Sequence, residues 1–150
     1  MEKRESPIKT PLIINSNILI ACLKSKGLTR QILFSKQLKR IFNVFLLDFC
    51  FDEIWKYRSR WNTQNLSDND LLTLLDFLFK ERIQIYPSNK IQDKIAEALN
   101  IMKNIDQKDT PILALALHVQ GIIWSYDNHL KEQVRIKCLT TNELKILLKL

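Results

Sequence analysis

Five short apolar runs constrain the fold of this chain more strongly than any other feature of its sequence. They lie at residues 12–14, 43–47, 83–86, 122–126 and 136–139, and longer segments with apolar residues at helical spacing separate them. Runs of this kind, without regular alternation of apolar and polar residues, are typical of parallel strands covered on both faces. We therefore expect an α/β fold with three layers, α/β/α, around a central parallel sheet of about five strands.

Helical periodicity and capping residues predict the segments between these runs. Helices are expected at residues 17–25, 29–40, 49–61 and 89–104, at LLTLLDFLF, at DTPILALALHV and at NELKILLKL. Their expected boundaries are Thr29, Ser67, Asp109 and Thr141 as N-caps and Gly27 and Gly121 as helix stops. Residues 1–11 are polar and contain two prolines, so they are expected to form a flexible arm before a single domain at 12–150.

The composition favours a polyanionic partner. The chain of 150 residues carries 23 basic and 16 acidic residues, a net charge of +7, which suits RNA, DNA or an anionic membrane surface. A lysine-rich composition that keeps the protein soluble is the alternative reading. The three cysteines are far apart and lie among apolar residues, and no CxxC pair occurs, so neither a disulfide nor a structural zinc is expected. With no apolar span or signal-like N-terminus, a cytoplasmic protein with no membrane partner is expected.

Acidic side chains gather where the expected strands end. In a parallel sheet the ligand site forms outside the carboxyl ends of the strands. These positions hold Asn15, Asp48, Glu53 and Asp127, while Asp106 and Asp109 precede the helix expected beside the fourth strand. Carboxylates at one rim repel each other unless a cation lies among them, and Mg²⁺ and Mn²⁺ prefer oxygen ligands. The pattern therefore indicates metal-dependent chemistry on a phosphate group.

Each acid also has a structural explanation. Asp109 is suited to cap a helix, Asp127 followed by Asn128 can form an Asx turn, and Glu53 can pair with a residue one helical turn later. Only the joint placement of the acids at one rim favours a functional site.

These motifs resemble those of the PIN-domain nucleases, the family that includes the VapC-type ribonuclease toxins. The similar segments are PLIINSNILIA, FDEIWK, DTPILALA, IIWSYDNHL and IKCLTTNELKILL, which follow the family's order over nearly the whole chain. In DTPILALA, Asp109 stands seven residues before Ala116, and IIWSYDNHL is similar to the family's strand followed by Thr/Ser-x-Asp. The resemblance implies a PIN-like sheet between helices.

The resemblance also implies a set of site residues. Members of the family hold Mg²⁺ or Mn²⁺ with a few acids and use the metal to activate water against a phosphodiester. Glu53, Asp109 and Asp127 match three of those acids, as catalytic and metal-binding residues, and Asp106 matches an additional acid just before the third. Ser125 and Asn17 match small polar neighbours of the site, which we expect to contact nucleic acid.

The first acid differs from the family's pattern. The family usually places Asp where this chain has Asn15, within NSN. An amide offers a carbonyl oxygen but no charge, so we expect Asn15 to lie at the catalytic site and to weaken metal binding. Activity then depends on whether Asp106 or Asp48 compensates. Natural degeneration and an engineered silencing of a toxic nuclease both explain the substitution.

Basic and aromatic residues after Glu53 suggest a nucleic-acid surface. In IWKYRSRW, Lys56 and Arg60 are expected on the same side of one helix as Glu53, where they can hold phosphates, and Tyr57 or Trp61 can stack a base. For Trp61, a place in the core is the favoured alternative.

For three further side chains we compare a functional role with a structural one. His129 can approach the substrate, and an exposed helix start is its alternative. Trp124 and His118 are expected to be structural residues.

Two functions therefore follow from the sequence. The first is a metal-dependent endoribonuclease, with single-stranded RNA as substrate, a possible toxin paired with an antitoxin or another protein partner. The second is a catalytically impaired PIN scaffold that binds RNA or a protein. Many family members dimerise, so a homodimer is expected in either case.

Overall fold

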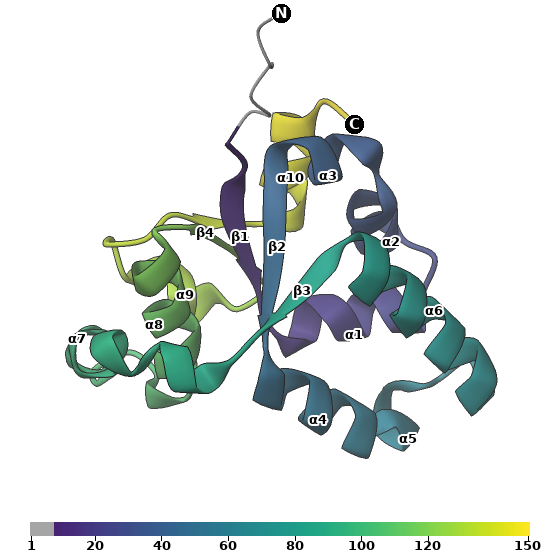
Figure 1. Ribbon diagram of the computed structural model, residues 1–150, viewed down its shortest axis with the longest axis horizontal. Coiled ribbons are helices and arrows are strands. Elements are labelled where there is room, and N and C mark those ends of the chain that lie inside the picture. The colour runs from purple at the N-terminus through teal and green to yellow at the C-terminus, as the bar shows by residue number, and fades with distance from the viewer. Residues whose placement is uncertain (1–7) are drawn as a thin grey trace, which may run out of the picture.

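Five parallel strands form the central sheet of this protein. The computed structural model describes residues 8–150, so most of the expected N-terminal arm lies outside the described residues. The strands are β1 (Thr10–Ile14), β2 (Phe42–Leu47), β3 (Ile83–Tyr86), β4 (Ile122–Trp124) and β5 (Cys138–Leu139). Their order is β3-β2-β1-β4-β5, and every neighbouring pair is parallel (Figure 1). The expected α/β fold with a five-stranded parallel sheet is confirmed.

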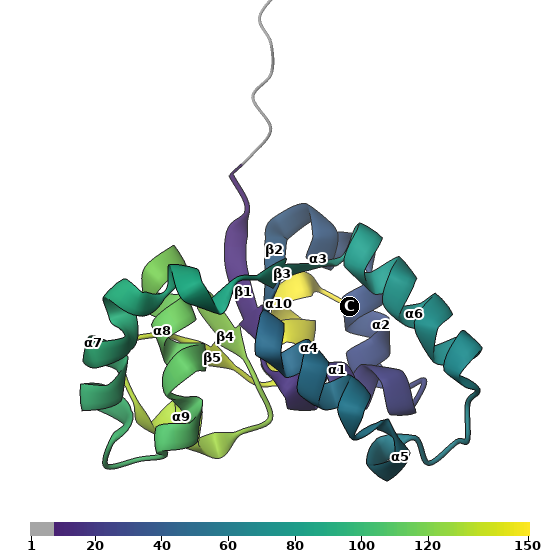
Figure 2. The same ribbon diagram turned by 60° about the horizontal axis from the view of Figure 1, so that its bottom comes forward.

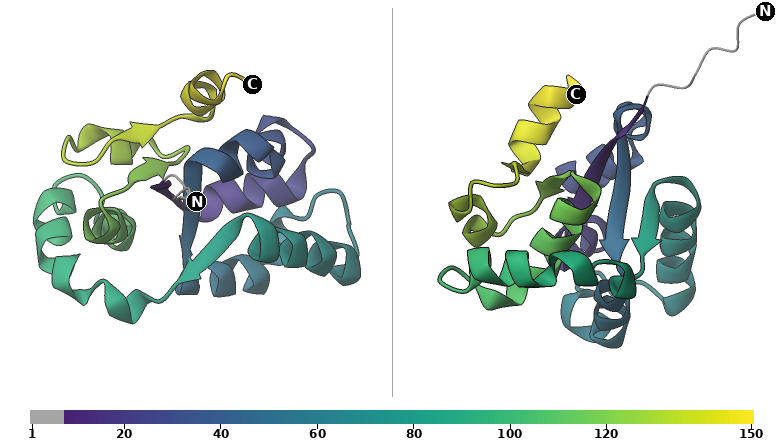
Figure 3. Two further views of the ribbon diagram at one scale, coloured as in Figure 1. Left: turned by 45° about the horizontal axis from the view of Figure 1, so that its top comes forward. Right: turned by 60° about the vertical axis from the view of Figure 1, so that its left-hand side comes forward.

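Helices cover the sheet on both faces. The helices α1, α2, α3, α6 and α10 lie on one side, and α8 lies on the other with α7 outside it (Figures 1 and 3). The helices α4 and α5 lie beyond the carboxyl end of β2. Their bounds are α1 (Ser16–Lys24), α2 (Leu28–Phe34), α3 (Lys36–Ile41), α4 (Asp48–Lys56), α5 (Arg58–Trp61), α6 (Asp68–Glu81), α7 (Gln92–Met102), α8 (Thr110–Val119), α9 (Asn128–Glu132) and α10 (Thr141–Leu148), with 3-10 turns η1 (Ser88–Lys90) and η2 (Gln107–Asp109).

The middle strand β1 is the most deeply buried. Leu12, Ile13 and Ile14 have no exposed surface, because helices cover both faces and strands flank both edges. This explains why the segment is apolar at every position rather than at alternate ones. The strand begins at Thr10, two residues before the expected start.

Gly121 is required by close packing and not by a helix stop. The left-handed residue that ends α8 is Gln120, with φ of 55°, and no described glycine has a positive φ. A Cβ atom on Gly121 would lie 2.7 Å from the Pro11 carbonyl oxygen and 2.7 Å from Ile13 Cδ1. The absence of a side chain therefore lets the start of β4 approach β1.

Two expected helices are each broken in two. The segment at 29–40 divides at Ser35, which has extended backbone and whose hydroxyl caps α3 by accepting a bond from Leu38 N. The segment at 49–61 divides at Tyr57, so α4 ends at Lys56 and a single turn, α5, follows. Neither break has a glycine or proline to mark it in the sequence.

Two expected N-caps are wrong by one or two residues. Gly27 occupies the N-cap position of α2, which leaves Thr29 inside the helix, and Gly27 does not stop α1. Thr140, not Thr141, caps α10 in a capping box with Glu143. None of the described helices is long and apolar enough to cross a membrane.

Candidate metal centre

The candidate site lies where the direction of strand order reverses. From β1 the chain moves outward to β2 and β3 and then returns to β4 on the other side of β1. In parallel sheets this is the position of the ligand crevice. Asn15 directly follows β1 and Ser125 directly follows β4. Figure 2 turns this end of the sheet toward the viewer, with α8 and α9 on one side and α1 and α4 on the other.

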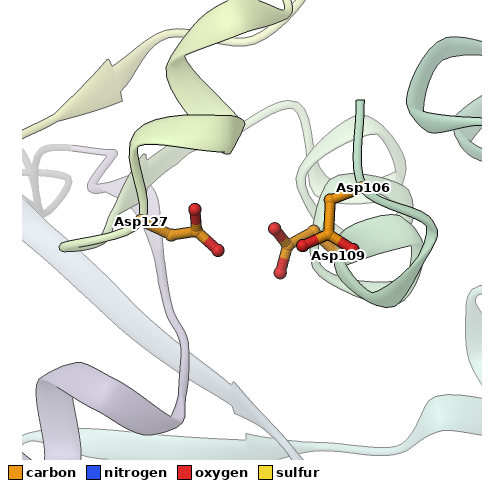
Figure 4. Close-up of side chains that lie close together, drawn as sticks. All are labelled: Asp106, Asp109 and Asp127. Carbon is orange, nitrogen blue, oxygen red and sulfur yellow. The ribbon is translucent and has the colours of Figure 1, made fainter. Parts of the chain in front are cut away.

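Three carboxylates meet at this end. Ligand oxygens of Asp106, Asp109 and Asp127 all lie within 4.8 Å of one another. Asp127 extends from the segment after β4, and Asp106 and Asp109 face it from the segment before α8 (Figure 4). These residues come together because α8 packs against both β1 and β4. An arrangement of this kind is repulsive without a cation.

Asp109 is the least satisfied of the three. Its side chain is only 9% exposed, and its Oδ2 atom is buried without a hydrogen-bond partner. It occupies the N-cap position of α8, as expected, but its carboxylate makes no capping bond. Burial, followed by the neighbouring Asp127 and Asp106 carboxylates, raises the pKa of Asp109 to about 7. A divalent cation would supply the partner that this oxygen lacks.

Asp127 is held in place by its own turn. Its Oδ1 atom accepts a bond of 2.8 Å from His129 N at the start of α9, which is the expected Asx-type arrangement. Its backbone N–H donates to Ser125 Oγ at 2.9 Å. The carboxylate is therefore held in place, and it points toward Asp109 (Figure 4).

Hydrogen bonds favour the ionised form of Asp106. Its Oδ1 atom accepts a bond from Lys108 N at 3.0 Å, and its Oδ2 atom lies 3.3 Å from His129 Nδ1. The Lys108 bond, with a smaller contribution from His129, lowers the pKa of Asp106. The Asp106 contact in turn raises the pKa of His129.

Asn15 is linked to the acids through Ser125. Its amide nitrogen donates to Ser125 Oγ at 2.9 Å, so the same hydroxyl oxygen holds both Asn15 and the backbone of Asp127. The Asn15 side chain is 9% exposed, and its Oδ1 atom is buried without a partner. The rim therefore presents two unsatisfied buried oxygens, one on Asn15 and one on Asp109, which is the donor set that a hard cation prefers.

Of the two acids considered as compensation for Asn15, only Asp106 lies in the cluster. Asp48 instead accepts bonds from Phe49 N, Ser88 N and Ser88 Oγ, which connect the ends of β2 and β3. Although desolvation alone would raise it, these hydrogen bonds lower the pKa of Asp48. Glu53 is exposed on α4 and is not a member of the close acidic group among the described residues.

The expected nucleic-acid residues are divided between three places. Asn17 Oδ1 accepts a bond of 3.5 Å from Tyr126 N at the rim, and His129 is exposed beside Asp106. Ser125 is buried and holds Asn15 and Asp127, so in this structure it positions the site; its contact with nucleic acid stays a prediction.

The basic pair lies apart, around the break between α4 and α5. Arg60 and Lys56 lie 4.4 Å and 5.4 Å from the ring centre of Tyr57. Lys56 lies one helical turn after Glu53 on α4, as expected, but the expectation that Arg60 continues the same helical side is wrong, because the helix ends at Lys56.

The residues for which a structural role was expected or favoured do have one in the structure. Trp61 is buried and donates to Ile54 O, and Trp124 is fully buried and donates to Thr141 Oγ1. His118 is half-buried and pairs with Asp93 at 2.9 Å. Burial raises the pKa of the Cys22 thiol to about 12 and that of Cys50 to about 11, as expected for thiols in a core.

Comparisons with known proteins agree with this geometry. A family model described as a PIN domain matches residues 13–149. No curated protein matches the chain.

Two solved structures are similar in fold. One is VapBC2 from Rickettsia felis, bound to a DNA fragment from the promoter of its own genes. It has a TM-score of 0.67 and 12% identity, and the match covers 87% of this chain and 98% of that chain. VapBC-1 from nontypeable Haemophilus influenzae has a TM-score of 0.58 and 13% identity over 88% and 98%. At these identities the likeness is one of fold.

Proposed function

The chain belongs to the PIN-domain family, and we propose that it is a metal-dependent endoribonuclease that cuts single-stranded RNA. The observation that supports the proposal most strongly is the buried, unpartnered oxygen of Asp109 opposite two further carboxylates. Without a cation this carboxylate is unfavourable to bury, and a metal-binding role in a nuclease would explain its position.

Asp106, Asp109 and Asp127 would hold the ion, Mg²⁺ or Mn²⁺, with Asn15 Oδ1 as a neutral oxygen on the same rim. When bound, such an ion lowers the pKa of water and stabilises charge that develops on a phosphate. Glu53, on the helix beyond β2, stays a candidate catalytic acid at the periphery.

The remaining residues prepare the site. Ser125 fixes the separation of Asn15 and Asp127 by accepting a bond from each. Lys108 N keeps Asp106 ionised, which favours cation binding. His129 and Asn17 at the rim, and Lys56 and Arg60 around Tyr57, would contact the RNA chain and its phosphates.

We extend the proposal to partners and location. The two structural neighbours are VapBC assemblies, which supports an antitoxin-type protein partner and a role as the toxin of such a pair. A homodimer and a cytoplasmic location belong to the same proposal.

A PIN scaffold that binds without cutting is the second candidate. Asn15 removes one negative charge from the rim, and Glu53 is not in the close acidic group, so cation affinity is lower than four converging carboxylates would give. This candidate retains RNA or a protein as the ligand.

One cleavage experiment separates the two candidates. A labelled single-stranded RNA pool is incubated with Mn²⁺ or EDTA and with the natural chain, Asn15→Asp or Asp109→Asn. The endoribonuclease predicts cutting by the natural chain that disappears with EDTA and in Asp109→Asn. Cutting by Asn15→Asp alone shows that the amide silences the site. No cutting by any folded variant with Mn²⁺ contradicts the nuclease and favours the scaffold.

A further inference from the structure

Tyr126 lies between Ser125 and Asp127 in the chain, and its side chain is open to solvent. Its side chain is 49% exposed, whereas Trp61 and Trp124 are buried. A tyrosine after a strand has no chemical signature of its own in the sequence. Its position next to Asp127 was the available signal.

Tyr126 is held by hydrogen bonds at its hydroxyl and at its backbone, although its ring does not belong to the core. Its hydroxyl is hydrogen-bonded to Thr29 Oγ1, a side chain of α2 that is only 5% exposed. Its backbone N–H donates to Asn17 Oδ1 at 3.5 Å. An aromatic ring that is fixed in orientation and open to solvent loses little conformational entropy when it binds a flat ligand.

A groove of about 320 Å³ opens beside this ring. It lies between the loop that joins α1 to α2 and the start of α10, and its polar lining includes Lys24, Ser25 and Asn142. Gly27 also lines it, so no side chain narrows the groove at that point. An ammonium group, a hydroxyl and an amide can bind a phosphate and the polar edge of a base.

We propose that Tyr126 stacks a nucleobase next to the phosphate at the metal centre, and that this groove takes that base. The inference rests on the proposed function and deepens it by naming a residue that selects an unpaired base. Tyr126 and Asp127 are consecutive, so their Cα atoms lie about 3.8 Å apart, and an RNA strand that reaches the Asp127 carboxylate passes close to Tyr126. A duplex keeps its bases stacked on each other, so the site is selective for single-stranded RNA.

Binding in EDTA tests this without requiring catalysis. The affinity of the full chain is measured for a short single-stranded RNA and for the same backbone without bases. Tyr126→Leu should weaken binding of the RNA with bases by about 5- to 150-fold, the value of one stacked base, and should leave the abasic RNA unchanged. Tyr126→Phe keeps the stacking ring but loses the bond to Thr29, so it should bind the RNA with bases more tightly than Tyr126→Leu and no more tightly than the natural chain.

Phe77→Leu is the matched control, because Phe77 is a 39% exposed aromatic residue on α6, away from the groove. It should leave binding of both RNAs unchanged. The proposal is overturned if Tyr126→Leu has no effect, if it weakens both RNAs equally, or if Phe77→Leu has the same effect.

Should Tyr126→Leu fail to fold, the natural chain still gives an answer. Ring proton resonances of Tyr126, assigned through Tyr126→Phe, should shift upfield when the RNA with bases is added and not with the abasic RNA. Equal or absent shifts overturn the proposal. Failure of the nuclease function looks different, since it leaves base-dependent binding intact but without cleavage.

Discussion

At the scale of single residues, the site is defined by oxygens that have no partner. Asp109 Oδ2 and Asn15 Oδ1 are both buried and unsatisfied, while Asp48 has three hydrogen-bond donors. Unpartnered oxygens therefore mark Asn15 and Asp109 as candidate ligands, whereas Asp106 and Asp127 also accept hydrogen bonds and are candidates because they lie in the same cluster. The sequence showed which acids follow strands. It could not show that Ser88, forty positions later, donates hydrogen bonds to the Asp48 carboxylate.

The raised pKa of Asp109 predicts how stability depends on pH without metal. The folded chain keeps a proton on Asp109 up to about pH 7, whereas the unfolded chain releases it near 3.8. Folding therefore takes up a proton at Asp109 in this range, and the contribution of Asp109 to stability falls as pH rises from 4 to 7. His129, whose pKa is raised, acts in the same direction because its contribution is also lost as pH rises.

Thermal melts in EDTA at pH 5 and pH 8 measure this effect. The natural chain should melt at a lower temperature at pH 8, and Asp109→Asn should reduce the difference, leaving the His129 contribution. If Asp109→Asn melts with the same pH dependence as the natural chain, Asp109 is not the titrating group.

Asn15→Asp tests the first position of the rim. A carboxylate at this position can accept a hydrogen bond from the Ser125 hydroxyl, so the link between the ends of β1 and β4 is preserved. The added charge should tighten Mn²⁺ binding by about tenfold or more and lower the melting temperature in EDTA, because a fourth acid joins three others. Calorimetric titration and melts check both effects; unchanged affinity would mean that Asn15 does not face the ion.

At the scale of elements, the strands were predictable and the helix breaks were not. The residues of the central strand β1 from Leu12 to Ile14 are apolar on both faces, and that pattern is visible in the sequence. The divisions at Ser35 and Tyr57 lie within continuous helical periodicity, where tertiary packing decides. Ser35 was available as a capping signal, but the requirement for Gly121 depends on Pro11, which is distant in sequence.

Gly121→Ala tests the close approach of β4 to β1. The added Cβ would lie 2.7 Å from the backbone oxygen of Pro11, so the strands must separate. We expect a loss of about 1–3 kcal/mol in the free energy of unfolding and weaker Mn²⁺ binding, because Asn15 and Ser125 follow these strands.

Gly27→Ala is the matched control for this substitution. Its nearest neighbour is the end of the Ser25 side chain at 3.1 Å, and its φ is −80°. Urea denaturation should show a change smaller than about 1 kcal/mol for Gly27→Ala. Equal losses for the two variants would contradict the packing argument.

At the scale of the whole molecule, a basic protein brings three of its acids together at one end of the sheet. The net charge of +7 favours a polyanionic partner, and the acidic group concentrates negative charge where a cation would bind. The fold makes this separation possible because strand order reverses at β1 and β4. The family's order of motifs indicated this arrangement from sequence, whereas the placement of Glu53 outside the group required the structure.

The charge predicts a steep dependence of RNA binding on salt. Each phosphate neutralised by a lysine or arginine releases counterions, so the logarithm of the affinity falls with the logarithm of salt concentration by about 0.7 per contact. Lys56→Ala and Arg60→Ala should each reduce this slope by about one contact, measured by anisotropy in EDTA. A slope near zero would favour a protein as the main partner.

The central claim is that Asp106, Asp109 and Asp127 hold a divalent cation. Its most direct test is calorimetric titration of Mn²⁺ into the natural chain and into Asp109→Asn, with Asp48→Asn as the control acid outside the group. The account predicts one saturable site in the natural chain and in Asp48→Asn, and loss of that site in Asp109→Asn. Equal Mn²⁺ binding by the natural chain and Asp109→Asn, or loss of binding in a folded Asp48→Asn, would contradict it.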